Sequence, residues 1–204
     1  MDLHQQYQNY TEGLKRFNHS ILQLTFKEWV KLRVIPEQIK SPISFEERFM
    51  REVYLVANLS KDPRTRIGAV IVKDNDVIST GFNGFCRGVL DLEERYGDRE
   101  TKYKFICHAE HNSILNAARK GISTLGSRLY TNGISCSECS KAVIQAGIKT
   151  IICHKQWPNL TYSENWVKSI ELTKIMFEEA GVEIQWFDKE LGIKGFLDGK
   201  EIGV

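Results

Sequence analysis

The sequence predicts an α/β protein: a three-layer α-β-α sandwich around a central five-stranded mixed sheet, with a helical extension at its N-terminus. The first supporting observation is a regular alternation of helix and strand patterns after residue 108. The second is a pair of β-branched segments before it, joined by a short polar turn. The third is size, since 204 residues, 42% of them hydrophobic, suffice for one domain with a buried core. We expect a helical extension over 1–42, a domain over 43–188 and a tail over 189–204.

The N-terminal region carries apolar side chains at helical spacing. This pattern predicts two helices before residue 35, the second over 21–34, and Pro36 and Pro42 then end the helical block. Ser44 followed by Glu47 has the spacing of a capping box, which predicts a helix over Phe45–Leu59.

The rest of the domain is predicted from periodicity and from turn residues. Two strands, Ile67–Val72 and Val77–Thr80, form a hairpin, and the charged segment 81–103 shows no firm helix or strand pattern. Glycines end each later helix. The later elements are expected at Ala109–Lys120 (helix), Ser127–Thr131 (strand), Ser137–Ala146 (helix), Ile148–Cys153 (strand), Tyr162–Ala180 (helix) and Val182–Phe187 (strand). The Gly-rich tail over 189–204 is assigned no element and is expected to be loosely held.

Composition and charge restrict the class of function. The net charge of +2 lacks the basic excess of proteins that bind nucleic-acid phosphates, so a small-molecule ligand is expected and nucleic acid is not. No apolar run reaches the roughly 20 residues of a membrane span, and the polar start does not resemble a signal peptide. We therefore expect a cytoplasmic protein without a membrane partner, whose five cysteines are thiols or metal ligands.

One group of residues has the composition of a metal site. His108 lies two residues before Glu110, and Cys136 and Cys139 lie three apart at a predicted helix start. One imidazole and two thiolates make three ligands, the number that catalytic zinc uses while leaving a fourth position for water. A structural zinc site would normally need a fourth ligand, and the other cysteines show no second paired spacing. We expect one catalytic Zn²⁺ per chain.

Glu110 is interpreted as a proton carrier. Zinc lowers the pKa of a bound water to roughly 7, and a nearby carboxylate can take that proton and pass it to a leaving amine. The alternative is a first-turn glutamate that only stabilises the helix dipole.

These residues resemble the zinc-dependent cytidine and deoxycytidylate deaminases, whose signature is His-x-Glu with Pro-Cys-x-x-Cys. The resemblance covers roughly residues 45–187 and points to the deoxycytidylate branch. It is carried by the segments Ser60–Ala69 (SKDPRTRIGA), Gly81–Phe85 (GFNGF), Thr101–Tyr103 (TKY), Cys107–Glu110 (CHAE) and Ile144–Lys149 (IQAGIK).

The resemblance implies a cytidine deaminase-like fold and a chemical activity. The expected reaction is hydrolytic deamination of deoxycytidine monophosphate (dCMP) to deoxyuridine monophosphate (dUMP) and ammonia, by a zinc-bound hydroxide with Glu110 as proton shuttle. His108, Cys136 and Cys139 would hold the zinc. Asn83 would bind the sugar, and the Ala109 backbone would meet the base.

Assembly and regulation are further implications of the resemblance. The chain is expected to form a homo-oligomer, for example a hexamer, activated by dCTP and inhibited by dTTP. The loop over 84–102 is the candidate effector site, with Gly84, Arg87 and Lys102, together with Arg95 and Arg99, as its candidate residues. The N-terminal helices, with Leu14, Phe17, Leu24, Phe26 and Trp29, either serve assembly or extend the core.

The sequence departs from the family at two positions, because Ser135 and Cys86 stand where prolines are usual. Ser135 either offers a hydroxyl to the substrate amine or is a tolerated loop substitution, and Cys86 is expected to be a buried, inert thiol. His154 and Lys155 lie at a strand end that could meet a substrate phosphate, or are simply loop residues.

Two alternative functions remain at this point. One is deamination of another cytosine nucleoside or nucleotide, or of a base within nucleic acid. The other is a catalytically inactive regulatory protein that zinc stabilises, although the presence of Glu110 argues against it.

Overall fold

The computed structural model describes residues 2–16, 25–26, 28, 41–155, 157 and 164–204. The chain forms two compact units, Met1–Pro42 and Ile43–Val204. In the first unit, helix α1 (Leu3–Arg16) places the Tyr7 ring 5.2 Å from the Phe26 ring, measured between centroids. The second helix expected over 21–34 lies largely outside the described residues, as do Phe17, Leu24 and Trp29. A role of this extension in assembly stays a prediction.

The second unit is built on a five-stranded sheet with the strand order β2-β1-β5-β6-β7. β1 pairs antiparallel with both β2 and β5, whereas β5, β6 and β7 are mutually parallel, so the expected mixed sheet is confirmed. Its strands are β1 (Gly68–Lys73), β2 (Asp76–Phe82), β5 (Arg128–Thr131), β6 (Thr150–His154) and β7 (Glu183–Phe187).

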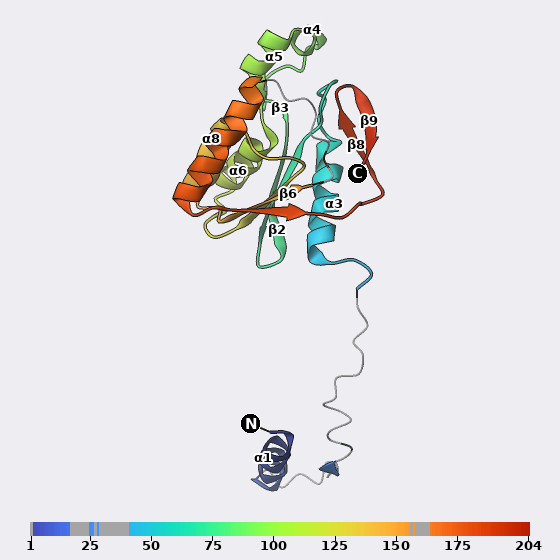
Figure 1. The fold of residues 1–204 in the computed structure, drawn as a ribbon, viewed down its shortest axis with the longest axis vertical. Coiled ribbons are helices and arrows are strands. Elements are labelled where there is room, and N and C mark those ends of the chain that lie inside the picture. Colours follow the sequence, from blue (N-terminus) through green and yellow to red (C-terminus); the bar gives the residue numbers. More distant parts are fainter. Residues whose placement is uncertain (1, 17–24, 27, 29–40, 156, 158–163) are drawn as a thin grey trace. The chain divides into compact units, whose positions relative to one another are not determined.

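Helices cover both faces of this sheet, which confirms the three-layer arrangement (Figure 1). On one face lies α3 (Phe45–Ala57), whose N-cap Ser44 accepts a hydrogen bond of 3.1 Å from the Glu47 backbone N–H. On the other lie α6 (Ala109–Arg119), α7 (Ser137–Gln145) and α8 (Glu164–Ala180). Alternate residues of each strand enter the two cores, as the two-residue period of a strand requires. In the described part of the chain, none of the helices has the length and apolar character needed to cross a membrane.

The charged segment 81–103, expected to lack regular structure, is instead ordered into short elements. These are β3 (Gly84–Phe85), α4 (Glu93–Gly97), α5 (Arg99–Phe105) and β4 (Ile106–Cys107). The Phe85 ring stacks on the Tyr96 ring with centroids 4.3 Å apart, and the Asp98 carboxylate caps α5 by accepting from the Thr101 N–H at 2.7 Å. Phe85 and Tyr96 are eleven positions apart in the sequence, so a local hydrophobic periodicity could not predict their contact.

The tail over 189–204 is also more ordered than expected. It forms a hairpin of β8 (Lys194–Leu197) and β9 (Lys200–Gly203), and Leu191, Leu197 and Val204 are buried in the core beside α3. The expectation of a loosely held tail was therefore wrong. Its glycines suggested a lack of structure, yet Gly199, with φ of 78°, forms part of a tight turn that joins two strands.

A close approach between β2 and α6 places the helix on the sheet. Gly81 lies in β2, and a Cβ atom at this position would clash with the backbone of α6 at Ala109 and Ser113. Only a glycine therefore permits this spacing. Because α6 begins at residue 109, the same contact fixes the position of the helix N-terminus.

We expect the Gly81→Ala substitution to lower the free energy of unfolding by about 1 to 3 kcal/mol, because the added methyl group must push α6 away from β2. Denaturant unfolding followed by circular dichroism measures the effect. Gly203→Ala is the matched control, since an added Cβ there meets no atom within 4 Å. Equal midpoints for the two variants would show that the contact is not a constraint.

Candidate metal centre and its cavity

Three ligand atoms meet where two helices begin. His108 is the N-cap residue of α6 and Cys136 is the N-cap residue of α7, while Cys139 lies in the first turn of α7. His108 Nδ1 lies 3.4 Å from Cys136 Sγ and 3.5 Å from Cys139 Sγ. Within the described part of the chain, this metal-ligating cluster has these three members, with ligand atoms within 4.8 Å of one another. The structure thus brings together the three predicted ligands.

The distances fit a zinc ion. A tetrahedral zinc with Zn–N of about 2.0 Å and Zn–S of about 2.3 Å has N···S edges of roughly 3.5 Å. Both measured N···S distances match this edge. Two sulfurs and one nitrogen are also the softer ligands that zinc accepts, and three of them leave one tetrahedral position for water or substrate. The residues present therefore suit a catalytic zinc site.

The thiol groups are electrostatically prepared for a cation. Hydrogen bonds from Cys139 and His108 lower the pKa of the Cys136 thiol to about 4. The contact with Cys136, together with burial, raises the pKa of the Cys139 thiol, and the Cys136 sulfur raises the pKa of His108. A bound divalent cation would favour the thiolate form of both sulfurs.

Glu110 lies in the first turn of α6, two residues after the ligand His108. Its side chain is buried, with 5% of the residue exposed, and it lines the same cavity as His108. Ala109 also lines this cavity. The helix start therefore presents a metal ligand, a backbone segment and a carboxylate to one space.

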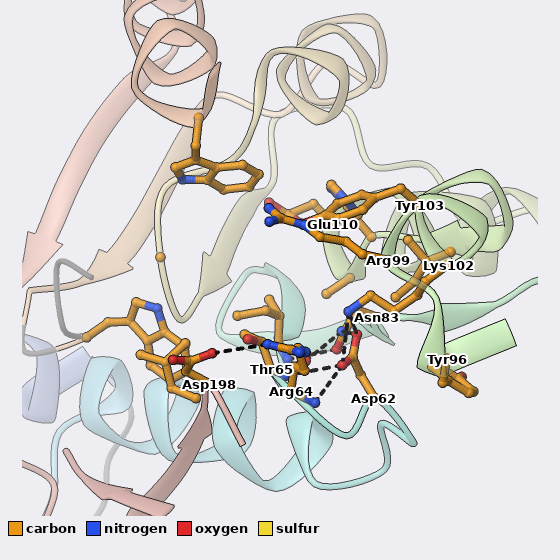
Figure 2. A pocket seen from close by; sticks show the side chains of 18 of the residues that line it. Asp62, Arg64, Thr65, Asn83, Tyr96, Arg99, Lys102, Tyr103, Glu110 and Asp198 are labelled. Atoms are coloured by element: carbon orange, nitrogen blue, oxygen red, sulfur yellow. Dashed lines mark hydrogen bonds and ion pairs between the residues drawn. The ribbon is translucent and has the colours of Figure 1, made fainter. Parts of the chain in front are cut away.

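The cavity has a volume of about 400 Å³, which is in the range of small-ligand sites. Its lining combines residues from distant parts of the chain. Figure 2 labels its charged side chains: Asp62, Arg64, Arg99, Lys102, Glu110 and Asp198. Aromatic lining is provided by Tyr96, Tyr103, Trp157 and Trp166. Sequence reasoning missed Asp62, Arg64, the tryptophans and Asp198 as site residues, although Asp62 and Arg64 lie within the segment SKDPRTRIGA.

The cations of the cavity differ in their partners. Lys102 Nζ lies 3.0 Å from Asp62 Oδ2 in a nearly buried ion pair. Arg64 Nη1 lies 3.8 Å from Asp198 Oδ1, with both side chains about 70% exposed. Among the described residues, no carboxylate lies within ion-pair distance of Arg99, whose guanidinium is 5.5 Å from the Tyr103 ring centroid. Arg99 is therefore the cation without a carboxylate partner among the described residues that line the cavity.

Asn83, expected to bind the sugar, lines the cavity but is held by the protein. Its Oδ1 accepts a 2.8 Å hydrogen bond from the Ile67 N–H, and its Nδ2 donates a 2.8 Å bond to the Thr65 carbonyl. This side chain fixes the segment that carries Arg64. A direct contact with a sugar stays a prediction.

The remaining candidate residues are dispersed. Ser135 is fully buried, lies outside the cavity lining, and its hydroxyl finds no hydrogen-bond partner in the described part of the chain. Of the five candidate effector residues, Arg99 and Lys102 line the cavity, while Arg95 donates to the Leu90 carbonyl at 3.0 Å. Gly84 is buried in β3, and exposed Arg87 bonds Asn116 at 3.1 Å. The structure does not gather them into one cationic site.

One further expectation is corrected, and one alternative finds no support. Cys86, expected to be buried, is exposed because β3 ends one residue before it. His154 does not face the cavity: its Nδ1 lies 2.6 Å from the Tyr54 hydroxyl and its Nε2 lies 2.8 Å from the Lys189 carbonyl. Lys155 pairs with Asp188 at 2.6 Å and is not a cavity residue either.

We expect Cys139→Ala to lose the bound zinc, because two ligands no longer complete the site. Metal content of the purified protein, measured by mass spectrometry alongside circular dichroism, tests this. Cys86→Ser is the matched control, since it removes an exposed thiol outside the cluster. A folded Cys139→Ala protein with one zinc per chain would refute the ligand assignment.

Comparison with known proteins gives a consistent result. A model of the cytidine and deoxycytidylate deaminase zinc-binding region matches residues 43–155. An uncharacterized deaminase from the luxG 3′ region of Aliivibrio fischeri is 37% identical over 145 residues, 71% of this chain and 95% of the relative. Human deoxycytidylate deaminase is 33% identical over 153 residues, 71% of this chain and 80% of the relative.

A solved structure shows the same fold. The crystal structure of dCMP deaminase from the cyanophage S-TIM5, in complex with dCMP and dUMP, superposes with a TM-score of 0.56 and 26% identity. The match covers 72% of this chain and 99% of the phage chain. The matched region 43–155 contains the complete ligand cluster, and the fold around it is cytidine deaminase-like. The chain therefore belongs to the cytidine and deoxycytidylate deaminase family of zinc-dependent hydrolases.

Proposed function

We propose that this deaminase acts on deoxycytidine monophosphate and releases deoxyuridine monophosphate and ammonia. The observation that carries the proposal is the composition of one cavity: its lining includes His108 of the metal cluster and Glu110, together with Arg64 and Arg99. A metal ligand beside the Glu110 carboxylate suits the deamination of a base. The two guanidinium groups suit a phosphate, because they bind phosphate oxygens through charge-assisted hydrogen bonds.

The cavity also suits the rest of a mononucleotide. About 400 Å³ accommodates a base, a sugar and one phosphate, and aromatic rings such as Tyr103 and Trp166 offer faces on which a base can stack. The relatives named deoxycytidylate deaminase and the phage enzyme bound to dCMP support this choice of substrate.

The roles of the side chains follow from their chemistry. When bound, zinc supplies Lewis-acid activation of a water molecule at neutral pH. The Glu110 carboxylate would take a proton from the attacking water, whose oxygen bonds to C4 of the base. It would pass the two water protons to ring N3 and to the amino nitrogen, so that the C4–N bond breaks and the nitrogen leaves as ammonia. The Ala109 backbone lies beside Glu110 and can hold the base edge. Burial of Glu110 at 5% exposure keeps bulk water from competing for the proton.

The alternatives have less support. A catalytically inactive, zinc-stabilised protein would not need a buried carboxylate facing the cavity beside the ligand His108. Another cytosine nucleoside or nucleotide would use the same metal site, and a substrate panel distinguishes it. Regulation by dCTP and dTTP, and assembly into an oligomer, stay predictions.

We expect Glu110→Gln to retain zinc but to lower kcat for dCMP by a factor on the order of 10² or more, because an amide cannot carry the proton. Ammonia release and metal content are measured on the same samples. Glu138→Gln, a first-turn glutamate of α7 whose side chain is exposed, is the matched control. Near-native turnover by Glu110→Gln would remove this residue from the mechanism.

We expect the protein to prefer dCMP over deoxycytidine, and Arg99→Ala to lower that preference about tenfold through a higher KM for dCMP. Steady-state kinetics with both substrates give the ratio of their kcat/KM values. Arg119→Ala removes an exposed arginine of α6 that does not line the cavity and serves as control. Equal kcat/KM for dCMP and deoxycytidine in the unmodified protein would contradict the proposed substrate.

A further inference from the structure

The C-terminal hairpin forms part of the cavity wall. Leu197 and Asp198 line the cavity, although the hairpin lies beyond the family region 43–155. We propose that Asp198 restricts the substrate to a single phosphate group, by placing a carboxylate where a second phosphate would lie. This inference rests on the proposed deamination of a cytosine nucleotide.

The hairpin is bound directly to the segment that carries Arg64. The Arg66 N–H donates to the Phe196 carbonyl at 3.0 Å, and the Gly199 N–H donates to the Arg64 carbonyl at 2.8 Å. The Arg66 guanidinium lies 4.4 Å from the centroid of the Phe196 ring. Two backbone hydrogen bonds and a cation–π contact therefore hold the hairpin beside one wall of the cavity.

The position of the hairpin is also set by the core. Leu197 is 6% exposed and Val204 is 5% exposed, and both pack in the cluster that contains α3. The Leu191 N–H donates to the Val204 carbonyl, and the Val204 N–H donates to the Ile193 carbonyl, each at 3.1 Å. Asp198 is thus held by a packed element of the fold and not by a free chain end.

The turn directs Asp198 to the cavity. Leu197 pairs with Lys200, so Asp198 and Gly199 form a two-residue turn, and both have positive φ, 50° and 78°. Asp and Gly are residues that tolerate this conformation. At the tip of the turn, the Asp198 carboxylate remains about 70% exposed and lies 3.8 Å from the Arg64 guanidinium. Figure 2 shows this pair in the cavity, with a dashed line between the two residues.

The distribution of charge explains the selectivity. Asp62 forms a nearly buried pair with Lys102, and Asp198 lies within ion-pair distance of Arg64, so Arg99 is the described cavity cation with no carboxylate at that distance. One phosphate can bind at Arg99. A second phosphate adds further negative charge without a free cation, and it meets the exposed Asp198 carboxylate. Rejecting a competitor by an added repulsive charge is an effective route to specificity.

The test compares kcat/KM for dCMP and for deoxycytidine diphosphate (dCDP) in the full-length, zinc-loaded protein. We expect the unmodified protein to prefer dCMP, and Asp198→Asn to raise the dCDP-to-dCMP ratio about tenfold. Asparagine has the same shape and also tolerates positive φ. Glu201→Gln is the matched control, because Glu201 lies on the same hairpin, pairs with Lys194 and is 62% exposed. It is expected to leave the ratio unchanged.

A second readout separates the charge from a structural role. Raising the salt concentration to about 0.5 M screens exposed charges, so the ratio in the unmodified protein should rise toward that of Asp198→Asn, while the variant responds less. An unchanged ratio in Asp198→Asn, or an equal rise in Glu201→Gln, overturns the inference and leaves dCMP deamination standing. If the unmodified protein releases ammonia from neither nucleotide, the proposed function fails, and the inference fails with it.

Discussion

The meeting of two helix N-termini is the constraint on which the site depends. α6 and α7 begin at His108 and Cys136, so both helix dipoles present their positive ends to the same point. The thiolates of α7 are favoured by this field, and a metal ion is held by residues whose backbone positions belong to rigid helices. The close contact of α6 with Gly81 of β2 fixes the position of this helix on the sheet. A small displacement of either helix would separate ligand atoms that now lie 3.4 and 3.5 Å apart.

Asp62 organises the opposite side of the cavity. Its carboxylate accepts hydrogen bonds from the backbone N–H groups of Arg64 at 2.8 Å and Thr65 at 3.2 Å, and it pairs with Lys102. Lys102 belongs to α5, so this buried pair joins the segment before β1 to the inserted helices. Removing one partner would leave an uncompensated buried charge, which typically costs several kcal/mol. The pair therefore supports the position of Arg64 and of α5, which carries Arg99.

A neutral histidine joins the C-terminal segment to the sheet. A carbonyl oxygen only accepts hydrogen bonds, so His154 Nε2 must donate to Lys189, and His154 Nδ1 then accepts from the Tyr54 hydroxyl. Burial lowers the pKa of His154, which favours this neutral form. Tyr54 lies on α3, His154 on β6 and Lys189 after β7. This link positions the chain segment that precedes the C-terminal hairpin. His154, which was considered for phosphate binding, therefore has a structural role.

The sequence by itself determined the alternating helices and strands, the mixed sheet and the cluster of His108, Cys136 and Cys139. Periodicity is a local property, and the spacing of Cys136 and Cys139 at a helix start can be recognised from neighbouring residues. His108 lies 28 positions before Cys136 and was assigned from its side-chain chemistry and its spacing to Glu110. The ordered segment 84–107, the C-terminal hairpin and the pairing of Arg64 with Asp198 were decided only by the tertiary structure. Their stabilising contacts join residues far apart in the chain, such as Arg66 and Phe196, and burial of Leu197 and Val204 depends on a surface formed by other elements.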